Sequence, residues 1–131
     1  MPNRVVHFEI HAENPERCAE FYTKIFGWKI TKLDFGGINY WSVETGPKEE
    51  PGINGGIVKR IGSAPAPGAP VFGYACTLQV ESYDETVAKL EAAGSMCALR
   101  KFPIPGMAWQ GYYIDTEGNI FGIHQMDPNA K

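Results

Sequence analysis

The chain has 131 residues, of which 44% are hydrophobic and 21% are charged, and its formal net charge is −3. These values predict a single soluble globular domain that is large enough to bury a core. The sequence contains no dense Lys/Arg run and no apolar stretch near the roughly 20 residues that cross a bilayer, so we expect neither a nucleic-acid nor a membrane partner.

The chain opens with a predicted strand over residues 4–11. Apolar and polar residues alternate there with a period of two, which is typical of a half-buried strand. The alternation places His7, Glu9 and His11 on one face and Phe8 on the other. We expect the face with the two histidines to point into a cleft.

An amphipathic helix is predicted next. Asn14 is a favourable N-cap, Pro15 suits the first helical position, and Gly27 is a plausible stop. Three short strands should follow, over residues 28–33, 38–43 and 55–59.

The second half of the chain repeats this order. After a Pro-rich linker, a strand over residues 72–80 leads into a helix that Ser82 caps and Gly94 ends. Three more strands are predicted over residues 96–102, 107–114 and 120–125. The predicted fold class is α+β, with two βαβββ modules whose curved mixed sheets surround a central cleft. The single domain, 1–131, then consists of module 1 (3–60), a linker (61–71) and module 2 (72–127).

The two halves align best at an offset of 68 residues. This offset pairs Ile10 with Leu78, both on the predicted core face, whereas an offset of 69 would place Leu78 opposite Glu9. Because a slip of one residue inverts the two faces of a strand, we prefer 68. The counterpart of His7 in the second half is then Ala75.

Two segments resemble a known family. His7-Phe8-Glu9-Ile10, followed by 14–17 and 19–28, resembles the opening module of the vicinal oxygen chelate superfamily, which includes glyoxalase I and the bleomycin resistance proteins. Residues 115–123, Asp-Thr-Glu-Gly-Asn-Ile-Phe-Gly-Ile, resemble the closing segment of that family. The resemblance implies two βαβββ modules around one cavity, a small-molecule ligand and a homodimer.

The resemblance also implies where a metal would bind. In metal-dependent members each module contributes one ligand from its first strand and one from its last. Carried over to this sequence, the first-strand positions fall on His7 and Ala75, and the last-strand positions fall on Gly56 and Gly122. Because only His7 can coordinate an ion, we expect no standard metal site and no cofactor. A displaced site formed by His7, Glu9 and His124 is the alternative through which a divalent metal would bind.

Other candidate site residues follow from the predicted faces. His7 and Glu9 are the candidate catalytic pair, acting as acid and base without a metal. The predicted ligand-binding residues are His7, Glu9, Tyr40, Trp109, Tyr113, Gly122 and His124. Aromatic walls with a few polar groups suit a small, partly apolar organic molecule.

The functional prediction is a glyoxalase-like protein that binds a small organic ligand. The alternatives are a lyase or isomerase of the lactoylglutathione lyase type with a relocated metal or none, a bleomycin-resistance-like binder that sequesters a drug, and an accessory protein acting through its dimer surface. Three cysteines without CxxC spacing, Cys18, Cys76 and Cys97, and an N-terminus without an apolar signal segment predict a cytoplasmic location with reduced thiols.

Overall fold

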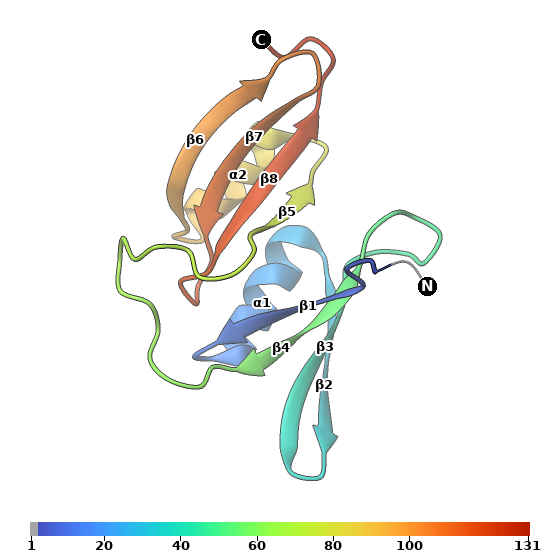
Figure 1. The fold of residues 1–131 in the computed structure, drawn as a ribbon, viewed down its shortest axis with the longest axis vertical. Coiled ribbons are helices and arrows are strands. Elements are labelled where there is room, and N and C mark those ends of the chain that lie inside the picture. The colour runs from blue at the N-terminus through green and yellow to red at the C-terminus, as the bar shows by residue number, and fades with distance from the viewer. Residues whose placement is uncertain (1–2) are drawn as a thin grey trace. The chain divides into compact units, whose positions relative to one another are not determined.

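The computed structural model describes residues 3–131, which form two compact units (Figure 1). The first unit ends at Ala64 and the second begins at Pro65, within the segment expected to be a linker. Each unit contains one helix and one four-stranded sheet. No helix in the described part of the chain has the length and hydropathy needed to span a membrane.

The first unit has the element order strand, helix, and three strands. Its elements are β1 (His7–Ala12), α1 (Pro15–Phe26), β2 (Lys29–Phe35), β3 (Ile38–Glu44) and β4 (Asn54–Lys59). The strands lie in the order β1-β4-β3-β2. β1 runs parallel to β4, and the other two pairs are antiparallel. The connection from β1 to its parallel neighbour therefore carries the helix and the β2–β3 hairpin.

Helix α1 begins and ends where the sequence predicts. The Asn14 side chain accepts a hydrogen bond from the Arg17 backbone N–H at 3.1 Å, which satisfies one of the unpaired donors at the helix start. Gly27 adopts a left-handed conformation with φ of 72°, and its N–H bonds to the Thr23 carbonyl. A residue with a Cβ would be strained at that φ, so glycine ends the helix.

Helix α1 covers one face of its sheet with aromatic and aliphatic side chains. The rings of Tyr22 and Trp28 stack with centroids 4.6 Å apart, and Phe8 lies 5.8 Å from Trp28. Val43 and Ile57 are completely or almost completely buried on the strands. Burying one such aliphatic side chain stabilises a fold by about 1.5–3 kcal/mol, so these contacts fix which face of the sheet the helix covers.

The second unit repeats the architecture of the first. Its elements are β5 (Cys76–Gln79), α2 (Tyr83–Ala92), β6 (Met96–Ile104), β7 (Ala108–Ile114) and β8 (Ile120–Met126). The strand order β5-β8-β7-β6 matches that of the first sheet, and β5 is again parallel to β8. The α+β prediction of two βαβββ modules is therefore confirmed.

Helix α2 packs on its sheet through a tyrosine. Ser82 is the N-cap, since its hydroxyl accepts from the Glu85 N–H at 3.2 Å. Tyr83 follows, and its hydroxyl lies where a side chain at Gly111 would begin, so this glycine permits the close approach. Within residues 3–131, the Tyr83 hydroxyl is buried and has no hydrogen-bond partner. Burial, and to a smaller extent the charge of Cys97, raises its pKa to about 12.

The predicted strand over residues 72–80 is wrong at its start. The parallel ladder with β8 begins at Cys76, opposite Phe121. Continued backwards, the same register would pair residues 72–74 with residues 117–119. Those residues belong to the turn in which Asp115 accepts hydrogen bonds from the backbone of Glu117 and Asn119. Because the backbone of this turn bonds within itself, residues 72–74 have no strand to pair with, and the β5–β8 ladder begins only at Cys76.

Candidate functional site

Each sheet has one face that its helix covers and one that it does not, which we call the open face. On β1, Phe8 and Ile10 are half-buried on the helix side, whereas His7, Glu9 and His11 are exposed on the open side. The predicted alternation of β1 is therefore confirmed.

A histidine and a tyrosine form a pair on the open face of the first unit. The Tyr40 hydroxyl lies 3.2 Å from Nε2 of His7. The same hydroxyl occupies the space above Gly56, because a Cβ built on this glycine would lie less than 3.0 Å from it. Burial and the nearby charge of Glu9 raise the pKa of Tyr40, which favours its neutral, hydrogen-bonding form. The sequence predicted His7 and Tyr40 for the site, and the structure brings them together.

The predicted pair of His7 and Glu9 has a different arrangement. The Glu9 carboxylate lies 3.5 Å from Nε2 of His11, and both side chains are about half-exposed. His7 instead has the Tyr40 hydroxyl as its neighbour. Glu9 and His7 share the open face, but each has its own partner there.

The open face of the second unit carries a chain of hydrogen bonds centred on Gln110. Its Oε1 lies 2.7 Å from Nδ1 of His124, and its Nε2 donates to the Thr77 hydroxyl at 3.2 Å. Gln110 is only 5% exposed, so these two partners satisfy a buried amide. Gly122 lies beneath it: a Cβ at this position would be 2.7 Å from Gln110 Nε2 and 2.6 Å from Thr77 Oγ1.

Two of the predicted ligand-binding aromatics lie on the other face of this sheet. The register pairs Trp109 with Gln125 and Tyr113 with Phe121, whereas Gly122 and His124 point the opposite way. Nε1 of Trp109 donates a hydrogen bond to the Asp127 carboxylate at 3.0 Å. The ammonium of Lys101 lies 4.7 Å from the centre of the Trp109 ring. Burial and the neighbouring Cys97 raise the pKa of Tyr113 to about 12. The structure therefore does not bring Trp109 and Tyr113 together with Gly122 and His124.

The residues at the four implied metal positions do not suit a divalent ion. His7 is a possible ligand, but Ala75, Gly56 and Gly122 carry no coordinating group. At both glycines, other side chains occupy the space into which a carboxylate would extend. Among residues 3–131, no three His, Cys, Asp or Glu side chains cluster as metal ligands would. The displaced site of His7, Glu9 and His124 would draw on both units, and it stays a prediction.

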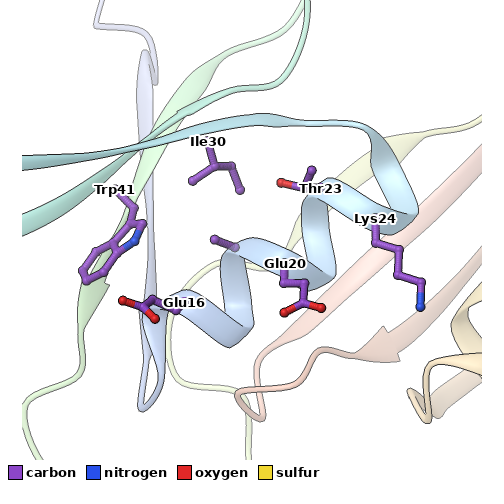
Figure 2. Close-up of a pocket in the computed structure, with 7 residues that line it drawn as sticks. Glu16, Glu20, Thr23, Lys24, Ile30 and Trp41 are labelled. Carbon is purple, nitrogen blue, oxygen red and sulfur yellow. The ribbon is translucent and has the colours of Figure 1, made fainter.

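A groove lies on the helix side of the first sheet (Figure 2). Its volume is about 470 Å³. Helix α1 forms one side and Trp41 and Ile30 the other. The ammonium of Lys32 lies 5.3 Å from the Trp41 ring and 3.6 Å from Glu16. None of the predicted site residues lines this groove. Tyr40 is next to Trp41 in β3, but adjacent strand residues point to opposite faces, so Tyr40 lies on the open face instead.

Comparisons with known proteins identify the architecture. Residues 4–46 match the sequence model of the bleomycin resistance protein-like N-terminal family. Solved structures align over nearly the whole chain. The chain therefore has the fold of the vicinal oxygen chelate superfamily. The resemblance that the opening and closing segments indicate is thus confirmed.

Three of the similar structures show the range of this superfamily. TnmS3, an antibiotic binding protein from a Streptomyces species, is 19% identical; the alignment covers 96% of this chain and 98% of that chain, with a TM-score of 0.66. A mutant of the fosfomycin resistance protein FosX from Listeria monocytogenes, complexed with Mn(II) and 1S,2S-dihydroxypropylphosphonic acid, is 15% identical, with coverages of 95% and 93% and a TM-score of 0.73. Glyoxalase I of Leishmania major is 18% identical, with coverages of 95% and 87% and a TM-score of 0.70. No protein of curated function matches by sequence.

The prediction from sequence missed Gln110 and Thr77. One signal could have found Gln110: it shares a strand face with Tyr112, and Tyr112 is opposite Gly122 in the register. Gly122 is thus the diagonal neighbour of Gln110, and a glutamine diagonal to a glycine on the adjacent strand has room to lie across it.

Proposed function

We propose that this protein binds a small organic molecule through polar side chains on the open faces of its sheets, without the metal ion of its metal-dependent relatives. The observation that supports this most is the filling of the two glycine positions. The Tyr40 hydroxyl lies above Gly56, and Gln110 with Thr77 lies above Gly122. A metal centre would need carboxylates there, whereas hydroxyl and amide groups suit hydrogen bonds to an organic ligand.

The comparisons are compatible with this proposal. The N-terminal match is to a bleomycin resistance protein-like family, and one structural neighbour is an antibiotic binding protein. Another neighbour is a complex with Mn(II), so the same fold also accommodates a metal ion. The residues at positions 56, 75 and 122 favour the first type for this chain. The proposed ligand is therefore a drug-sized organic molecule, and the proposed assembly is a homodimer.

A thermal-shift screen against aromatic antibiotics and glutathione adducts tests the proposal. Hits should raise the melting temperature equally before and after dialysis against EDTA, because the binding groups belong to the protein. His7→Ala should weaken the binding of a ligand that contacts the open face of the first unit. Lys48→Ala, in the exposed loop before β4, is the surface control and should leave binding unchanged. Hits that vanish with EDTA and return with Mn(II) would contradict the proposal.

The same samples separate a binder from an enzyme. A lyase of the lactoylglutathione lyase type would convert the hemithioacetal of methylglyoxal and glutathione into a thioester, whose ultraviolet absorption reports turnover. We expect saturable binding without turnover. Steady turnover that His7→Ala abolishes would favour the lyase alternative.

A further inference from the structure

The amide of Gln110 is held at both ends inside the second unit. Its carbonyl end lies 2.7 Å from His124 Nδ1 and its amino end 3.2 Å from Thr77 Oγ1. A glutamine with 5% exposure has little access to water, so these two neighbours are the partners that its polar atoms need. The amide is therefore a fixed link between β8 and β5.

Gly122 keeps this link in place. A Cβ at position 122 would lie 2.6 Å from Thr77 Oγ1, 2.7 Å from Gln110 Nε2 and 3.0 Å from a ring carbon of Tyr112. The absence of a side chain thus lets three neighbouring side chains lie close over the strand. Gly122 itself presents no side chain that would push Gln110 away from His124.

The direction of the hydrogen bonds determines what His124 presents to a ligand. The structure orients the Gln110 amide with its oxygen towards the ring, and an amide oxygen only accepts. In this orientation Nδ1 of His124 carries the proton and donates it. In the neutral ring the other nitrogen, Nε2, then holds a lone pair. Thr77 accepts from the amide and retains its own hydroxyl proton as a donor.

We propose that Nε2 of His124 is a dedicated acceptor for a hydroxyl-bearing ligand, such as a phenol, on the open face of the second unit, and that Gln110 is the positioning residue that fixes this role. This inference rests on the proposed function, and adds to it the chemical class of the ligand. A ligand with a methyl ether in place of the hydroxyl has no proton to donate to Nε2, so it should bind less tightly.

The tautomer can be measured without any ligand. The chain has only three histidines, His7, His11 and His124, so a long-range ¹H–¹⁵N correlation spectrum of the labelled protein resolves each ring, and His→Gln variants assign them. We expect the protonated nitrogen of His124 to be Nδ1 in the wild type. Gln110→Leu should release the ring towards the Nε2–H form that imidazole prefers in water. Tyr112→Phe, on the same strand face, is the matched control and should leave the tautomer unchanged.

The ligand class is tested with 1-naphthol and 1-methoxynaphthalene as paired probes. The first should shift the His124 Nε2 resonance and bind about 3- to 10-fold more tightly than the second, as one neutral hydrogen bond allows. Gln110→Leu should remove this preference. A wild-type Nε2–H tautomer, or equal responses to the two probes, would overturn the inference. The tautomer is observed in the free protein, so the two proposals fail separately. An Nε2–H tautomer would overturn this inference even if ligands bind without a metal, and metal-dependent ligand binding would overturn the proposed function even if Nδ1 carries the proton.

Discussion

Gly122→Ala should destabilise the second unit through the hydrogen bonds of Gln110. The backbone of Gly122 is not in the left-handed region, so alanine meets no strain from its own dihedral angles. The added methyl group would instead lie 2.7 Å from Gln110 Nε2 and 2.6 Å from Thr77 Oγ1. Both atoms are ends of side chains and can move, but moving Gln110 separates a buried amide from its partners.

The expected magnitude is the difference between two opposing effects. Leaving a buried polar group without its hydrogen bond costs about 1–3 kcal/mol. Replacing glycine by alanine restricts the unfolded chain and returns about 0.4–1 kcal/mol. The midpoints of these two ranges give a fall of about 1.3 kcal/mol in the free energy of unfolding, and their extremes give about 0 to 2.6 kcal/mol.

Urea denaturation followed by tryptophan fluorescence measures this change, and the chain offers a matched control. A Cβ at Gly46 would meet no atom within 4 Å, and its φ is not positive, so Gly46→Ala should be neutral or slightly stabilising. If Gly122→Ala is as stable as Gly46→Ala, the close packing above Gly122 is not what holds Gln110.

Three further substitutions test the fold. Asn14→Ala removes the N-cap of α1 and should lower the free energy of unfolding by about 1 kcal/mol, while Asn14→Ser should retain most of it; equal losses would deny a capping role. Asp127→Ala leaves the Trp109 indole without its acceptor and should cost about 1.5–3 kcal/mol in urea denaturation, more than Asp127→Asn, which keeps an oxygen. Because the pKa of Tyr83 is about 12 when folded and 10.0 when unfolded, the folded chain retains a proton that the unfolded chain loses between these values, so stability falls as the pH rises through them. Tyr83→Phe should flatten this fall in urea titrations at about pH 9 and about pH 11, and an unchanged slope would contradict the assignment.

The sequence predicts the local elements well because their signals are local. The cap at Asn14, the stop at Gly27 and the alternation of His7 and Glu9 with Phe8 each depend on a few neighbouring residues. The offset of 68 residues holds at the helices, whose N-caps are Asn14 and Ser82. It becomes 66 at the last strands, because Gly56 lies opposite Glu9 and Gly122 opposite Thr77.

What the sequence could not supply are distances between strands. The start of β5 at Cys76 depends on where the turn at Asp115 ends the neighbouring strand, which is a tertiary effect. Likewise, alternation separates Trp109 from Gln110, but it does not say which of them the helix covers. That choice depends on the packing of Tyr83 against Gly111, which only the three-dimensional structure provides.

Titration with Mn(II), followed by electron paramagnetic resonance of the free ion, tests the central proposal most directly. We predict that the free-ion signal of the purified, EDTA-treated protein rises in proportion to added Mn(II), as it does in buffer, while the organic ligand binds unchanged. Stoichiometric loss of the free signal, together with ligand binding that requires the ion, would show that a metal holds the ligand and that the side chains above Gly56 and Gly122 do not.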